Sequence, residues 1–298
     1  MNKTQLGYLY MLLSAASFAS MSVFMKRAYD AGMTPWSFSV LQSLFALAQL
    51  FLLALREPPH PLPRPRVSGP LLLLFALAGA GAGIAFNVAL VSLSISLGSI
   101  LLFTYPAFVA VGAWLFLRER PSWPHIAALG MTLAGASLTV GPGGIAGGQI
   151  GLIGVLLALL SAVSQGVYII LGDRIGGGLS PVRATILTRG AIMAGSVLLY
   201  PRVIPELFAL TPQAVWITLG ASLVGGVAPF LFLYKGIALI GANRAAIVSV
   251  VELPIALLLG RLFEGDQILP VQLLGAGLIA VAVVLSQGRS APEGGPPE

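Results

Sequence analysis

The chain has 298 residues, of which 57% are hydrophobic and 9% are charged, and its mean hydropathy is +0.95. Soluble globular domains carry about 25% charged residues, so this composition excludes a water-soluble globule and predicts a protein embedded in lipid. The net charge is +6, but the 16 Lys and Arg residues are spread in ones and twos between apolar segments, so no nucleic-acid partner is indicated.

Apolar runs between charges, prolines and turns predict ten membrane-crossing helices. We expect them near residues 6–25, 35–55, 70–91, 98–117, 123–140, 151–172, 181–201, 213–235, 243–263 and 268–287. The stretches 67–117 and 121–172 contain no Asp, Glu, Lys or Arg. Because one crossing takes about 20 residues, each stretch holds two crossings and a turn. Gly, Ser and Pro place these turns at 92–98 and 141–151.

An internal duplication organises the chain. Residues 7–27 reappear as residues 154–174 at a constant offset of 147, and matches downstream continue at offsets of 144 and 145. Each unit would contain five crossings, and an odd number makes the second unit enter the membrane from the opposite side. The predicted fold is therefore an all-α polytopic membrane protein, with ten transmembrane helices arranged as two inverted five-helix repeats around a central cavity.

The predicted units cover residues 1–141 and 142–288, followed by a disordered cytoplasmic tail over 289–298. With a cytoplasmic N-terminus, eleven Lys and Arg residues lie on inner segments and four on outer ones, so both termini are expected in the cytoplasm. The longest linker, 56–68, is then cytoplasmic. A signal peptide is an alternative for the first helix, since residues 14–20 are small, but the apolar run is long and is repeated deep in the chain.

Two short patterns give the chain a family resemblance. Tyr105-Pro106 leads to Glu119 and then to a Gly-rich helix, and residues 252–254 (ELP) lead to Glu264 and a second Gly-rich helix. This pattern resembles the EamA-type repeat of the drug/metabolite transporter superfamily, and it looks most like the bacterial aromatic amino-acid exporters of the YddG type. The two copies differ, because 13 residues separate proline and glutamate in the first copy and 10 in the second.

The resemblance implies that the first, third and fourth helices of each unit surround the cavity. Candidate lining residues share polar or aromatic side chains on these helices: Ser17, Phe18, Met21, Phe86, Asn87, Tyr105, Ser164, Gln165, Tyr168, Phe230 and Tyr234. Aromatic rings with hydroxyls and amides, and few fixed charges, favour an amphipathic or aromatic solute. The alternatives are helix packing for the serines and core packing for the aromatic side chains.

Two ionisable residues, Arg189 and Glu252, lie within predicted crossings. Arg189 follows Pro181 by eight residues, which places it about 12 Å into the hydrocarbon layer. An unpaired charge there would cost about 3 kcal/mol, and Glu252 is the candidate partner by depth. A gate, a proton relay or a substrate contact are possible roles, but we expect a structural ion pair.

These features predict a secondary transporter that exports small metabolites, in particular aromatic or large apolar amino acids, across the bacterial inner membrane by alternating access. Its expected partners are the lipid bilayer and a small-molecule substrate, with no cofactor, nucleic acid or obligate protein partner. The alternatives are export of another drug or metabolite class, a channel, or a membrane enzyme. An enzyme is disfavoured because the sequence has two histidines, no cysteine, no HExxH and no GxSxG.

The predicted topology can be tested in this cysteine-free chain with Pro63→Cys and Gly144→Cys. A membrane-impermeant thiol reagent applied to intact cells should label position 144 alone, because residue 63 lies in the expected cytoplasmic linker. Labelling at 63 alone would invert the topology, and labelling at both positions would indicate dual insertion.

Overall fold

The computed structural model describes residues 2–57, 67–89, 93, 98, 101–117, 123–140, 151–175, 178–264 and 268–286. All regular elements in these ranges are helical. They are α1 (Lys3–Asp30), α2 (Pro35–Leu55), α3 (Gly69–Ala89), α5 (Tyr105–Gly112), α6 (Trp123–Val140), α7 (Leu152–Ile175), α8 (Pro181–Leu199), α9 (Val203–Phe208), α10 (Pro212–Ala221), α11 (Ala228–Ser249), α12 (Glu252–Glu264) and α13 (Pro270–Ser286), with two π-helical segments, η1 (Ala113–Leu117) and η3 (Ser222–Val227).

Within the described residues, six helical spans are long and apolar enough to cross a membrane: Lys3–Asp30, Pro35–Leu55, Gly69–Ala89, Leu152–Ile175, Pro181–Leu199 and Pro212–Ser249. Shorter apolar helices cover Tyr105–Leu115, Ile126–Thr139 and Pro270–Leu285. The all-helical, polytopic membrane character predicted from the sequence is therefore confirmed. The predicted turns at 92–98 and 141–151, the linker over 56–68 and the tail over 289–298 lie wholly or mostly outside the described residues.

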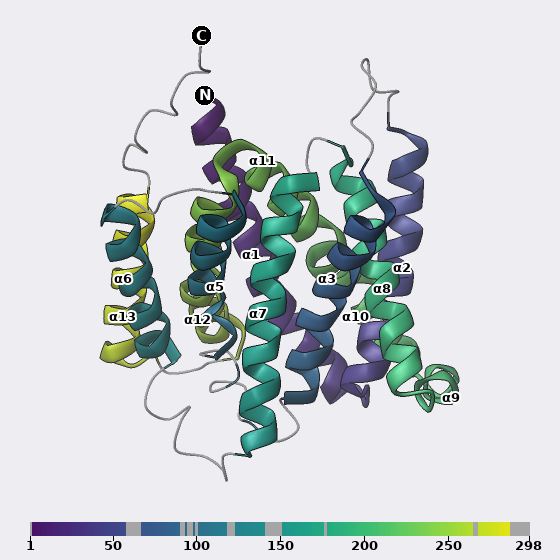
Figure 1. Cartoon of the computed structure of the whole chain (residues 1–298). Helices are drawn as coiled ribbons and strands as arrows, with labels where there is room; N and C mark the ends of the chain where they lie inside the picture. Colours follow the sequence, from purple (N-terminus) through teal and green to yellow (C-terminus); the bar gives the residue numbers. More distant parts are fainter. Residues whose placement is uncertain are drawn as a thin grey trace.

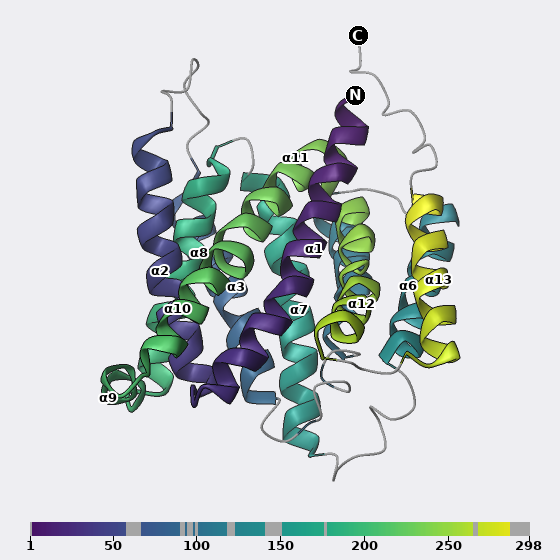
Figure 2. The same cartoon turned by 180° about the vertical axis from the view of Figure 1, so that it is seen from behind.

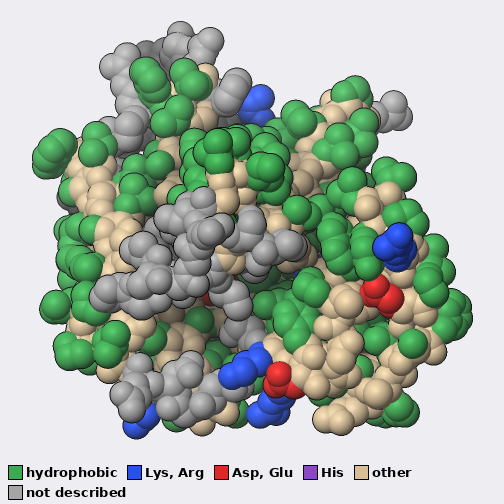
Figure 3. Space-filling model, turned by 90° about the horizontal axis from the view of Figure 1, so that it is seen from below, with side chains coloured by type: hydrophobic (Ala, Val, Ile, Leu, Met, Phe, Trp, Pro, Cys, Tyr) green, Lys and Arg blue, Asp and Glu red, His purple; other side chains and the backbone are tan. Residues whose placement is uncertain are grey.

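Large apolar side chains face outward over much of the surface. Leu55 is 83% exposed, Trp123 77% and Leu198 79%. Figure 3 views the molecule from the side opposite the start of α1, and hydrophobic side chains surround that face while charged ones occupy a few places. Such a surface is expected where lipid is the solvent.

Three helices begin with the same two residues, a capping Thr or Ser followed by proline. Thr34, Ser180 and Thr211 each cap a helix by accepting a hydrogen bond from the backbone N–H three residues later, at 3.1, 3.3 and 3.2 Å. In each case a proline follows at the first helical position, where its missing N–H costs nothing. The starts of α2, α8 and α10 are therefore determined locally.

The helices form two outer pairs and a central group. Figures 1 and 2 show α2 and α8 at one edge, α6 and α13 at the opposite edge, and α1, α3, α7 and α11 between them. Within the central group, α1 packs most extensively against α11, and α7 against α3. Ser14 on α1 donates from Oγ to the Pro229 carbonyl at 2.8 Å, and Ser161 on α7 donates to the Ala82 carbonyl at 2.6 Å.

These two hydrogen bonds repeat the sequence duplication. Ser161 follows Ser14 by 147 residues, and Pro229 follows Ala82 by the same number. The offset of 144 that sequence matching gives for the third and eighth helices is therefore wrong by three residues at this contact. A buried hydroxyl must reach an acceptor, so this hydrogen bond determines which residues of the two helices correspond. Matching glycines along the sequence imposes no such requirement.

The first helix of each half runs in the opposite direction. α1 ends beside the start of α2, where Thr34 contacts Glu206 just after α8. α7 ends beside the start of α8, where Ser180 contacts Glu57 just after α2. Because α2 and α8 are antiparallel neighbours, α1 and α7 finish at opposite faces (Figure 1). We call the face where α1 begins the N-terminal face.

Two predicted crossings are interrupted. The helix expected over 98–117 has a turn at residues 103–104, and the helix expected over 243–263 has a turn at residues 250–251. Each turn lies two to four residues before a proline, Pro106 or Pro254, whose ring has no N–H to donate to the preceding turn. Conversely, α11 continues past the predicted end at 235 and bends at Gly241, which has a φ of +77°.

The pair α6–α13 packs through glycine. A Cβ at Gly135 would lie 2.8 Å from the carbonyl oxygen of Gly275 and 2.8 Å from Ile279 Cγ1. Gln272 on α13 also donates from Nε2 to the Thr139 carbonyl at 3.0 Å. Because lipid tails give no hydrophobic drive for helix association, close approach of this kind is what holds two apolar helices together.

We expect Gly135→Ala to lower the free energy of unfolding by about 1 to 3 kcal/mol, because the added methyl overpacks the α6–α13 contact. The melting temperature of the purified protein in detergent should fall accordingly. Gly130→Ala on the same helix is the matched control, since nothing lies within 4 Å of a Cβ there. Equal melting temperatures for the two variants would show that the close contact contributes nothing.

Candidate functional site

Some side chains stay partly accessible although they lie on buried helix faces. On α7, Ser161 and Tyr168 are buried, but Gln165 between them on the same face is half-buried. On α3, Phe86 is half-buried although it shares its face with the buried Phe75. Polar and aromatic side chains of these two helices are therefore partly accessible.

Seven of the residues predicted to line a cavity share this half-buried state, and we call them the interior set: Ser17, Phe18 and Met21 on α1, Phe86 and Asn87 on α3, and Ser164 and Gln165 on α7. Phe18 packs edge-on against Phe230 of α11, with ring centroids 5.1 Å apart. Asn87 donates from Nδ2 to Ser39 Oγ at 3.2 Å. Their role as substrate-lining residues stays a prediction.

The other predicted lining residues, Tyr105, Tyr168, Phe230 and Tyr234, are buried. Tyr168 and Tyr234 share a hydrogen bond between their hydroxyls. The Thr188 hydroxyl of α8 lies 3.2 Å from the first and 3.3 Å from the second. Phe75 of α3 stacks on Tyr168 with centroids 4.8 Å apart. These four side chains, Phe75, Tyr168, Thr188 and Tyr234, form what we call the tyrosine cluster.

A pocket of about 350 Å³ lies on the N-terminal side of the tyrosine cluster. Its lining comes from α1, α7, α8, α11 and the segment before α8: Tyr10, Gly172, Ile175, Leu179, Pro181, Ala184, Tyr234, Lys235, Ala238 and Leu239. Lys235 is exposed and its Nζ lies 5.5 Å from the centre of the Tyr10 ring.

The tyrosine cluster lies between this pocket and the interior set. Along α7, Gln165, Tyr168 and Gly172 follow one another by about a helical turn each, toward the N-terminal face. Gly172 lines the pocket, and Gln165 belongs to the interior set. Along α11, Tyr234 likewise comes one turn after Phe230. The cluster therefore lies one helical turn from the pocket residue Gly172 and one turn from Gln165 of the interior set.

Arg189 is 4% exposed and is held mainly by backbone carbonyls. Its Nε donates to the Gly226 carbonyl at 2.9 Å, its Nη2 to the Gly225 carbonyl at 2.5 Å, and its Nη1 to Gln42 Oε1 at 3.1 Å. The guanidinium carbon also lies 4.5 Å from the centre of the Phe230 ring. Both glycines belong to η3, where the change between α- and π-helical pairing leaves carbonyls available.

The expected ion pair between Arg189 and Glu252 is wrong. No ion pair joins these two described residues, because the guanidinium of Arg189 points to η3 and α2 whereas Glu252 begins α12 beside α1 and α6. Glu252 is half-buried, and the nearby Tyr105 donates from its hydroxyl to the Ala246 carbonyl at 3.3 Å. Depth along the chain predicted the pairing, but side-chain direction decides it.

Three residues of this region, Gln42, Phe75 and Thr188, are absent from the residues predicted from the sequence. Gln42 was detectable, because it lies 147 residues before Arg189 and both are polar residues within apolar helices. Phe75 and Thr188 carry no comparable signal. Among the described residues, no group of three or more His, Cys, Asp or Glu side chains could hold a metal ion.

Comparison with known proteins gives consistent matches. The model of the EamA-like transporter family matches residues 5–141 and again residues 152–287. The chain is 26% identical to the uncharacterized transporter YcbK of Bacillus subtilis (strain 168) over 281 residues, which is 91% of this chain and 89% of that protein. It is 29% identical to the uncharacterized transporter sll1319 of Synechocystis over 186 residues, 62% of this chain and 56% of that protein.

A solved structure supports the same fold. One crystal structure superposes with a TM-score of 0.75 and covers 95% of this chain and 96% of its own chain, at 18% sequence identity. At this identity, the similarity concerns the arrangement of helices alone.

We expect Arg189→Gln to lower the free energy of unfolding by about 3 kcal/mol, because the η3 carbonyls and Gln42 lose their donor. The melting temperature of the purified protein should fall with it. Adding Glu252→Gln in a double variant should give no rescue, since the loss of Arg189 does not leave the Glu252 carboxylate without an ion-pair partner. Arg202→Gln, at an exposed position outside the helices, is the control and should change stability little. Recovery of stability in the Arg189→Gln/Glu252→Gln protein would contradict this interpretation.

Proposed function

Because the chain belongs to the EamA-like transporter family, we propose that it is a secondary transporter that moves a small metabolite across the membrane by alternating access. The position of the tyrosine cluster carries this function. A pocket reaches the cluster from the N-terminal face, and partly accessible polar and aromatic side chains lie beyond it. A closed layer at the inner end of a pocket is what a gate in such a transporter requires.

The ten-helix architecture is proposed as two inverted repeats over residues 1–141 and 142–288. Three observations support it: the family model matches the chain twice, α1 and α7 run in opposite directions, and the Ser14–Pro229 and Ser161–Ala82 hydrogen bonds share an offset of 147. Alternating access would then arise as the two halves exchange conformations around a site near the bilayer midplane.

The proposed substrate is an amino acid with an aromatic or large apolar side chain. The interior set offers the rings of Phe18 and Phe86 beside the amides of Asn87 and Gln165, which suits a solute with an apolar body and a polar end. The pocket on the N-terminal side of the tyrosine cluster, with a volume of about 350 Å³, is large enough to admit a ligand of that size. Arg189 does not serve as a carboxylate clamp here, because η3 and Gln42 engage its Nε, Nη1 and Nη2.

Orientation and direction complete the proposal. Lys3, Arg56, Arg174 and Arg183 lie near the N-terminal face, whereas Lys26, Arg27 and Arg202 lie at the opposite face, and the predicted count over the whole sequence is eleven to four. This bias supports cytoplasmic termini in a bacterial inner membrane. Export is proposed from the resemblance to aromatic amino-acid exporters.

Transport by protein reconstituted in liposomes tests the function directly. We expect uptake or exchange of radiolabelled aromatic amino acids, in a panel that also contains nucleobases and polyamines, with and without a pH gradient. Transport of another panel member alone would reject the proposed substrate class. Absence of transport for every member of the panel would reject the proposed transport of metabolites of these three classes.

Gln165→Ala should lower aromatic amino-acid transport several-fold and leave the melting temperature nearly unchanged, because a half-buried side chain contributes more to binding than to packing. Leu160→Ala on the same helix is the control, since Leu160 is exposed on the lipid face. A parallel fall in folded protein would indicate that Gln165 is a packing residue instead.

A further inference from the structure

The hydrogen bond between Gln42 and Arg189 joins residues that are 147 positions apart, which is the offset of the duplication. The starts of α2 and α8, Pro35 and Pro181, are 146 positions apart, so Gln42 lies within one residue of the counterpart of Arg189. Gln42 lies on α2 and Arg189 on α8, which form an antiparallel pair at one edge of the molecule (Figures 1 and 2). Residues this close to being counterparts can touch only near an axis relating the two halves.

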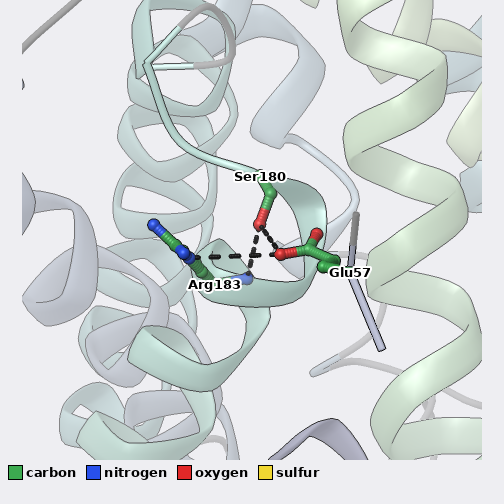
Figure 4. Close-up of polar contacts among 3 residues, drawn as sticks. All are labelled: Glu57, Ser180 and Arg183. Atoms are coloured by element: carbon green, nitrogen blue, oxygen red, sulfur yellow. Dashed lines mark hydrogen bonds and ion pairs between the residues drawn. The ribbon is translucent and has the colours of Figure 1, made fainter. Parts of the chain in front are cut away.

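Each end of the α2–α8 pair has the same kind of polar contact. Thr34, which caps α2, donates from Oγ1 to Glu206 Oε2 at 2.7 Å. Ser180, which caps α8, donates from Oγ to Glu57 Oε2 at 3.1 Å (Figure 4). In both cases a capping hydroxyl of one helix meets a glutamate that follows the other helix. We call these contacts the two clasps.

Neighbouring side chains hold both glutamates. Tyr200 donates its hydroxyl to Glu206 Oε1 at 2.9 Å, and Trp36 stacks on the Tyr200 ring with centroids 5.5 Å apart. The hydrogen bond to Glu206 raises the pKa of Tyr200, because the carboxylate favours the protonated phenol. At the other end, Arg183 Nε lies 4.0 Å from Glu57 Oε2 (Figure 4).

If the two halves exchange conformations, the contacts between α2 and α8 and the contacts within the tyrosine cluster should behave differently. The two clasps are of the same kind, a capping hydroxyl on a glutamate, and the Gln42–Arg189 contact joins near-counterparts, so all three can persist in both states. The counterparts of Tyr168 and Tyr234 at an offset of 147 are Met21 and Asn87, which cannot form a hydroxyl–hydroxyl bond. The Tyr168–Tyr234 contact must therefore be made and broken.

We infer that the α2–α8 pair is the fixed axis of the transport cycle, with its two clasps and the Gln42–Arg189 contact made in both states. The central helices α1, α3, α7 and α11 change their packing beside it. Arg189 has a positioning role in this axis, because it ties α8 to η3 and thus to the start of α11, which carries Phe230 and Tyr234. This inference rests on the alternating access proposed above.

Paired cysteines in this cysteine-free chain test the axis. Trp36→Cys/Tyr200→Cys and Glu57→Cys/Ser180→Cys each join α2 to the α8 region, one at each clasp. Gly172→Cys/Ile237→Cys joins α7 to α11 next to the tyrosine cluster, where a Cβ at Gly172 would lie 3.8 Å from Ile237 Cδ1. Each variant is reconstituted, cross-linked with a short bifunctional methanethiosulfonate reagent, and assayed before and after reduction with dithiothreitol.

The two α2–α8 cross-links should leave at least half of the transport of an aromatic amino acid, whereas the α7–α11 cross-link should abolish it until reduction. Two clasp positions guard against a variant that fails to fold. Loss of transport on α2–α8 cross-linking, restored by dithiothreitol, would overturn the axis and leave the transporter function standing. Transport in all cross-linked variants would overturn the gate at the tyrosine cluster, and no transport before cross-linking would reject the proposed function together with the axis.

Discussion

A guanidinium buried in a membrane protein must find acceptors, and Arg189 finds them in backbone carbonyls and one amide. The carbonyls of Gly225 and Gly226 are available because the backbone passes from α- to π-helical pairing at η3. Gln42 supplies the acceptor on α2. This arrangement joins α2, α8 and the start of α11. The positions of Phe230 and Tyr234 on α11 therefore depend on the side chain of Arg189.

The polar groups inside the assembly are organised in layers along the membrane normal. Half-buried residues such as Gln165 lie in one layer, and the hydroxyls of Tyr168, Thr188 and Tyr234 close the next. Hydroxyl groups that satisfy one another can be buried at little cost, and the same groups can be hydrated when the layer opens. The gate proposed above would therefore need no charged side chain.

Composition and patterning determined much of this fold. Apolar runs of about 20 residues between charges, prolines and turns predicted the helices, and two of the predicted ranges begin at Pro35 and Pro181, where α2 and α8 start. The duplication over 7–27 and 154–174 indicated that one set of contacts would be built twice, as Ser14 and Ser161 then show. These features are local or repeated, so they can be read along the chain without knowing which helices meet.

Tertiary structure decided what depends on side-chain direction. Depth along the chain suggested Glu252 as the partner of Arg189, yet the guanidinium points to the opposite neighbour, Gln42 and η3. Thr188 joins the tyrosine cluster because α3, α7, α8 and α11 meet there, and no periodic pattern marks it. A lone polar residue in an apolar helix must be satisfied, but its partner depends on which helix packs beside it. The sequence by itself therefore determined that Arg189 needed acceptors, and only the packing of α2 and α11 against α8 decided which ones it has.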